Sequence, residues 1–229
     1  MKMRGIRYWG RIWAETVGIT VALGVILYVF TGMDMGFRGD GNLFGSVVSL
    51  MAWYLIISSA FVTFIIIVSC FQQYIPLSMS FGSTRRSAVM GTLLPGPGSS
   101  AVSLAAAALL WAAAGDDIAR SGLHLLGAVG GGLLAVDGIA VLFGIIILRC
   151  RRITFVLMFM GLLIGAAGGI TWYLTTSGKL SVRITDLAGL LAGTGQPLLS
   201  AGLVAAGAVV YLLAFGLAFL LTRKAEVRI

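Results

Sequence analysis

Charged side chains are scarce in this sequence, and their scarcity excludes the water-soluble classes of protein. Asp, Glu, Lys and Arg make up 10% of the 229 residues, whereas a soluble domain carries roughly a quarter. Hydrophobic residues make up 59%, and the mean hydropathy is +1.03. Because the net charge of +8 is explained by basic residues gathered on one side of a membrane, we expect no nucleic-acid partner.

Residues that carry out chemistry are equally few. The chain has one histidine, His124, and no second histidine or carboxylate pair stands at metal-ligand spacing, so no metal site is predicted. Cys70 and Cys150 both fall near ends assigned below to the cytoplasm, where a structural disulfide is not expected. No glycine-rich phosphate loop ends in GK[ST]. We therefore predict no enzyme activity and no cofactor in this chain itself.

Long apolar runs fill most of the sequence, and six of them are long enough to cross a bilayer, which takes about 20 residues. Each run is apolar almost all round, as expected of a helix in lipid. The chain is therefore predicted to be a single all-α integral membrane domain covering residues 1–229. The predicted spans are approximately 13–31, 45–71, 87–114, 123–148, 153–175 and 197–222.

Basic residues are distributed unevenly between the two sides of these spans. Of the 16 Lys and Arg residues, 12 fall on one side and four on the other. The positive-inside rule assigns the richer side to the cytoplasm, with both termini inside. The basic residues of that side are Lys2, Arg4, Arg7, Arg11, Arg85, Arg86, Arg149, Arg151, Arg152, Arg223, Lys224 and Arg228.

The N-terminal segment before the first span has its own pattern. Ile6, Trp9, Ile12 and Trp13 recur at helical spacing, with arginines between them. This pattern predicts a short helix lying in the headgroup layer before the chain turns into the membrane. The alternative is an ordinary basic anchor with tryptophans at the membrane interface.

The third span contains the sequence PGPGSS at residues 95–100. Pro95 and Pro97 are predicted to break the helix, and nearby serines can then bond the freed carbonyls. Such a break can act as a hinge or line a cavity. A second interpretation makes Ser99 or Ser100 a nucleophile with His124 as its base, but nothing in the spacing supports that arrangement.

Asp137 is the acidic residue that lies deep within a predicted span. A charge at that depth costs about 2.5–3.5 kcal/mol on insertion scales, so the side chain is expected to face other helices or a wet cavity. With Pro95 and Pro97, it is a candidate for lining a conduit or relaying protons. The alternative is a protonated or hydrogen-bonded packing residue.

Glycine is abundant, at 32 residues, and several glycines are spaced four apart. Small residues at this spacing let helices approach closely in lipid. Tight packing of the bundle is therefore expected at such pairs, which include Gly127 with Gly131, Gly161 with Gly165, and Gly165 with Gly169.

The loop between the second and third spans, QYIPLSMSFGSTRRSAVMG, is the least lipid-like stretch among the spans. Pro76 suits the first turn of a short helix, in which Leu77 and Phe81 stand four apart and form one apolar stripe. Gly82 can end that turn, and the hydroxyl side chain at position 83 or 84 can cap the next helix. The sequence thus predicts a short helix, a protruding tip and a sharp re-entry into the membrane.

This loop resembles the corresponding loop of permease subunits of bacterial ABC exporters, the type-2 class with six helices. Many members carry a hydrophobic residue, then a small residue, an aromatic, glycine, a hydroxyl residue, Arg and a further basic residue at this spacing. The matching positions are Leu77, Ser80, Phe81, Gly82, Thr84, Arg85 and Arg86.

The resemblance implies a coupling helix that docks on a separate cytoplasmic ATPase, which would bind ATP and Mg²⁺. Phe81 is the candidate knob, Leu77 lies beside it, and Arg85 and Arg86 would contact acidic ATPase residues or lipid phosphates. A second permease chain, identical or related, and a bacterial plasma membrane are also implied. The alternative is an integral-membrane binding, immunity or sensor protein without an ATPase, for which Asp137 and the outer segment 184–193 would matter more.

Overall fold

Helices are the regular elements of this protein wherever its structure is described. The computed structural model describes residues 3–32, 43–80, 84–149, 161 and 197–224, and no strand occurs among them. Five helical stretches there are long and apolar enough to cross a membrane, namely Arg7–Phe30, Val47–Ser80, Arg86–Ala113, Leu125–Ile147 and Ala201–Leu220. The all-α prediction is confirmed for these residues, and the five stretches match five predicted spans. The sixth predicted span, 153–175, lies outside the described residues.

Several of the long helices are interrupted or extended by π-helical turns. In chain order the elements are α1 (Met3–Leu27), η1 (Tyr28–Gly32), α3 (Leu43–Ser69), η2 (Cys70–Tyr74), α4 (Ile75–Ser80), α5 (Arg85–Gly91), η3 (Leu94–Gly98), α6 (Ser99–Ala113), α7 (Asp116–Arg149) and α10 (Pro197–Lys224).

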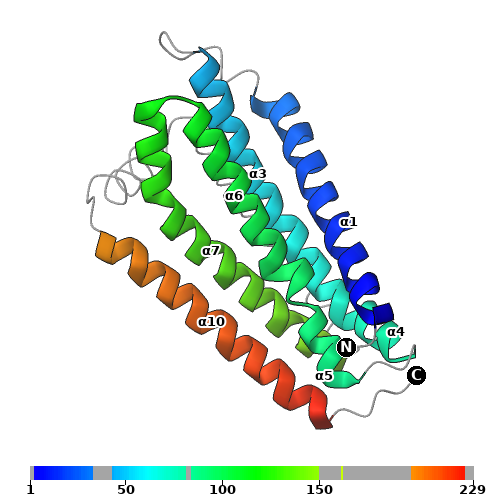
Figure 1. Cartoon of the computed structure of the whole chain (residues 1–229). Coiled ribbons are helices and arrows are strands. Elements are labelled where there is room, and N and C mark those ends of the chain that lie inside the picture. The colour runs from blue at the N-terminus through cyan, green and yellow to red at the C-terminus, as the bar shows by residue number, and fades with distance from the viewer. Residues whose placement is uncertain (1–2, 33–42, 81–83, 150–160, 162–196, 225–229) are drawn as a thin grey trace.

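The long helices lie side by side, with α3 and α6 in the middle of the bundle (Figure 1). Helix α1 packs on α3 at one flank, and α10 packs on α7 at the opposite flank. The first residues of α1, the short helices α4 and α5, and the last turn of α10 lie at the same end of the bundle. At that end the Arg86 guanidinium stands 5.5 Å from the centre of the Phe219 ring, which joins α5 to α10.

The N-terminal segment differs from its predicted form. Residues 6–13 belong to α1, one continuous helix from Met3 to Leu27, and do not form a separate helix. The reason is that one buried stripe, Trp9, Ile12, Thr16 and Thr20, continues at spacings of three and four residues from the start of the helix into the span. Because that stripe packs on the bundle, the tryptophan at its start is buried against neighbouring helices.

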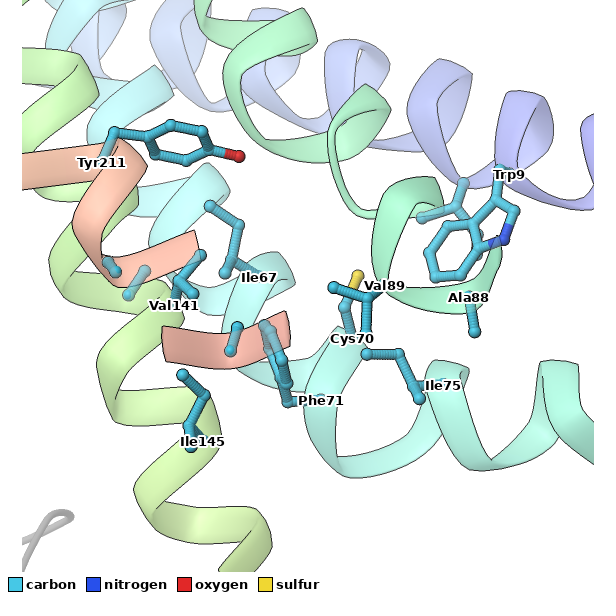
Figure 2. Packing of buried hydrophobic residues seen from close by; sticks show 14 residues of the cluster. Trp9, Ile67, Cys70, Phe71, Ile75, Ala88, Val89, Val141, Ile145 and Tyr211 are labelled. Carbon is cyan, nitrogen blue, oxygen red and sulfur yellow. The ribbon is translucent and has the colours of Figure 1, made fainter. Parts of the chain in front are cut away.

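Trp9 occupies the place where a side chain is missing on α5. Figure 2 shows its indole ring beside α5, close to Ala88 and Val89. A Cβ added to Gly91 would overlap this ring. The indole is 1% exposed, so Trp9 fastens the start of α1 to α5.

Glycines bring α7 and α10 into backbone contact. A Cβ at Gly131 would overlap the carbonyl of Leu203, and a Cβ at Gly207 would overlap the carbonyl of Gly131. Two turns further along α7, a Cβ at Gly138 would lie 3.0 Å from the Cα of Tyr211. The predicted close approach at Gly131 is therefore confirmed, and its partner is α10. No described residue lies within 4 Å of a Cβ added to Gly161, and Gly165 and Gly169 lie outside the described residues.

Hydroxyl groups join α1 to α3 by a different contact. Ser58 Oγ lies 2.9 Å from the Thr20 carbonyl oxygen, to which it donates, and the same distance from the Leu55 carbonyl oxygen of its own helix. Gly24 lies one turn beyond Thr20, and a Cβ there would stand 3.1 Å from Ser58 Oγ. The same Cβ would stand 3.3 Å from the Leu55 Cα, so this contact combines a rotatable hydroxyl with a close main-chain approach, whereas the contacts at Gly131 and Gly207 are with main-chain atoms alone and are closer.

Candidate functional site

Helix α4 begins where proline prevents the preceding helix from continuing regularly. Pro76 has no N–H, and its ring would crowd the carbonyl four residues earlier. The helix widens just before it, and the Ile75 N–H donates to the Cys70 carbonyl, five residues back. The predicted short helix with Pro76 in its first turn is confirmed, and it continues the second span through η2.

The return into the membrane is capped as predicted. Thr84 has extended φ and ψ angles, and its Oγ1 accepts a hydrogen bond of 3.2 Å from the Ser87 N–H. The Thr84 carbonyl accepts from the Ala88 N–H at 2.9 Å. These two bonds satisfy donors in the first turn of α5, which have no partner within their own helix.

The residues matched to the permease loop are only partly described. Leu77 is 46% exposed, and Ser80 is exposed and donates its hydroxyl proton to the Leu77 carbonyl at 2.6 Å. Helix α4 thus turns Ile75 and Ser78 inward and Leu77 and Ser80 outward. Phe81 and Gly82 lie outside the described residues, as does the side chain of Arg85.

The second candidate region is the break in the third span. Gly96, with φ −86° and ψ −108°, leaves helical geometry between Pro95 and Pro97. Ser99 Oγ donates to the carbonyls of Pro95 and Gly96. The predicted break, with a serine bonded to the freed carbonyls, is confirmed.

Asp137 faces this broken helix from α7. Its side chain is fully buried, and Oδ2 accepts a hydrogen bond of 2.9 Å from Ser100 Oγ, one residue beyond the Ser99 bonds. The interpretation that Asp137 faces other helices is confirmed. The side chain of His124 lies outside the described residues, so its pairing with Ser99 or Ser100 is not tested by the structure.

Two further helices approach the same carboxyl group. Thr63 of α3 lies beside it, and Tyr211 of α10 lies within electrostatic range of it. Thr63 Oγ1 directs its own proton to the Ser59 carbonyl at 2.7 Å. Asp137 Oδ1 consequently has no hydrogen-bond partner among the described residues, and neither does the buried Ser59 Oγ.

Sequence reasoning found Asp137 but missed the residues around it. Ser100 is 37 positions away, and Thr63 and Tyr211 lie on other spans, so no local spacing joins them. The available signal was the set of hydroxyl residues within otherwise apolar spans. Among the described residues, no group of three or more His, Cys, Asp or Glu side chains stands close enough to hold a metal ion.

Comparison with known proteins does not extend these assignments. No family model, no curated protein and no solved structure matches this chain.

Proposed function

We propose that this chain is the membrane subunit of an ATP-driven exporter of the ABC type and that a separate cytoplasmic ATPase docks on α4 and the turn that follows it. The proposal includes six spans with both termini in the cytoplasm, a second permease chain and a bacterial plasma membrane. ATP and Mg²⁺ would be bound by the ATPase. The resemblance of residues 77–86 to the coupling loop of that family is its starting point.

The attachment of this loop to the spans is the observation that supports the proposal best. Helix α4 continues α3 through η2, Trp9 of α1 lies on Gly91 of α5, and Arg86 of α5 lies over Phe219 of α10. A displacement of α4 and α5 would therefore be transmitted to α1, α3 and α10. Transmission of this kind is what coupling of ATP binding to a change in the bundle requires.

The proposal can be tested at Leu77, the exposed apolar side chain on α4. Leu77 is 46% exposed, and a central apolar anchor typically contributes about 2 kcal/mol to an interface. Leu77→Ala and Phe81→Ala are each expected to weaken co-purification of a Walker-A ATPase by more than about tenfold and to abolish substrate-stimulated ATPase activity. Both proteins should still insert into the membrane.

The matched control is Leu109→Ala, which removes the same side chain from the far part of α6, where Leu109 is 72% exposed. It should leave the ATPase bound. Full coupling in Leu77→Ala and Phe81→Ala would show that the docking site is assigned wrongly. If no ATPase accompanies the wild-type chain from native membranes, the exporter proposal fails and the ATPase-independent binding protein takes its place.

A further inference from the structure

Asp137 is buried at membrane depth without a cation to balance it. None of the six predicted spans contains a lysine or an arginine. Among the described residues, the side chains that interact with its carboxyl group are Ser100 of α6, Thr63 of α3 and Tyr211 of α10. Tyr211 is the one titratable group among these three, and its neutral form adds no positive charge.

In the part of the chain that the structure describes, the buried carboxyl group has a hydrogen-bond donor on one oxygen and no partner on the other. Oδ2 accepts from Ser100 Oγ at 2.9 Å. Thr63 has one hydroxyl proton, and that proton goes to the Ser59 carbonyl at 2.7 Å. The Thr63 oxygen can therefore only accept toward Asp137. Oδ1 is the carboxyl oxygen without a hydrogen-bond partner among the described residues, so a proton can be held there without breaking an existing bond.

We propose that Asp137 is a proton-binding site in which Oδ1 carries the proton in the packed state of the bundle. The bound proton removes the charge, which a fully buried site cannot solvate. Loss of the proton leaves a carboxylate held by a single donor, Ser100.

The position of the site gives the proton a mechanical role. Ser100 lies in the first turn of α6, four residues after the non-helical Gly96. Its bond to Asp137 therefore ties the part of the third span beyond the hinge to α7. Ionisation of Asp137 favours separation of these helices and entry of water. The protonation state of Asp137 therefore determines whether α6, beyond the break at Gly96, stays packed on α7. This inference does not depend on the exporter proposal, because it concerns the bundle with or without an ATPase.

Infrared spectroscopy of the full-length protein in lipid nanodiscs tests the site directly. The wild-type protein at neutral pH is expected to show the C=O stretching band of a protonated carboxylic acid. Asp137→Asn should lose this band, and Glu15→Gln, which changes an exposed carboxylate paired with Arg11, should retain it. Ser100→Ala should shift the band to higher frequency without removing it, because Ser100 donates to the carboxyl group.

A second measurement uses thermal unfolding against pH. A proton bound more tightly by the folded protein stabilises it at low pH, and this stabilisation is lost as the pH rises through ionisation in the folded state. The wild-type protein should therefore lose stability at high pH relative to Asp137→Asn, in which the amide cannot ionise. Absence of the protonated-acid band at neutral pH would overturn the proposal. So would a carboxylate band together with stabilisation by Na⁺, which would identify a cation site instead.

Discussion

The contact between α7 and α10 and the contact between α1 and α3 hold their helices together in different ways. Helices in lipid gain little from burying apolar side chains, so close packing and polar contacts must hold them together. Helices α7 and α10 achieve this with glycines that place main-chain atoms against each other. Helices α1 and α3 use the Ser58 hydroxyl, which bonds to the Thr20 carbonyl. At Gly131 and Gly207 an added Cβ would overlap main-chain atoms, whereas at Gly24 it would stand 3.1 Å from a rotatable hydroxyl and 3.3 Å from the Leu55 Cα.

The largest loss of stability is expected where a methyl group added to a glycine would overlap main-chain atoms of the facing helix. Gly131→Ala and Gly207→Ala each place a methyl group on a carbonyl of the facing helix, and the helices must separate to relieve the overlap. We expect a loss of about 3 kcal/mol or more in the free energy of unfolding, measured by denaturation in detergent micelles.

Neighbouring glycines provide controls for this pair. Among the described residues, no atom lies within 4 Å of a Cβ added to Gly132 on α7 or to Gly202 on α10. Alanine at either position should be neutral or stabilise the helix by roughly 0.5–1 kcal/mol. Equal effects at Gly131 and Gly132 would contradict the backbone contact.

A smaller loss of stability is expected where the added methyl group would overlap a side chain. Gly91→Ala meets the indole of Trp9, which can move at a cost of roughly 1–3 kcal/mol. Trp9→Phe should partly rescue Gly91→Ala, because a smaller ring leaves space for the methyl group. The coupling, measured by a double-mutant cycle, should lie in the range of about 0.5–3 kcal/mol. Gly10→Ala, at a position with no neighbour within 4 Å, serves as the control, and strict additivity would argue against the contact.

The smallest effect is expected at the hydroxyl contact. Ser58→Ala removes a bond to a carbonyl of the neighbouring helix, and interhelical hydrogen bonds of this kind average about 0.6 kcal/mol in membranes. Ser69→Ala is the matched change, because Ser69 Oγ donates only within its own helix, to the Ile65 carbonyl at 2.8 Å. A loss at Ser58 as large as that at Gly131 would remove the distinction between the two contacts.

Sequence reasoning located the helices and the break in the third span but not the way the helices pair. The position of each span follows from its length and hydropathy, and the break follows from Pro95 and Pro97. All of these are local properties of the sequence, so the spans and the break could be predicted. Pairing could not, because an apolar residue facing lipid and one facing a helix have the same hydropathy. Leu133 is buried and Leu212 is exposed, yet nothing in their surroundings in the sequence separates them.

For the candidate site, too, local features could be predicted from the sequence, whereas contacts between helices could not. The burial of Asp137 could be predicted because a charged group in lipid must find partners, and the cap at Thr84 because capping depends on adjacent residues. Trp9 was assigned to the membrane interface because tryptophan commonly lies there. Its actual partner, Gly91, lies on a different helix, and the lack of a side chain at Gly91 leaves no pattern to detect.

The glycine contact between α7 and α10 also has a consequence for how the protein is made. Residues 150–196 are synthesised between the two helices, so α7 enters the bilayer before its partner exists. During that interval the main chain at Gly131 and Gly138 lacks the α10 backbone that covers it in the finished bundle. A helix that is to approach Gly131 this closely needs a glycine at the facing position, as α10 has at Gly207. The surface that holds the finished bundle together thus also selects the helix that completes it during biogenesis.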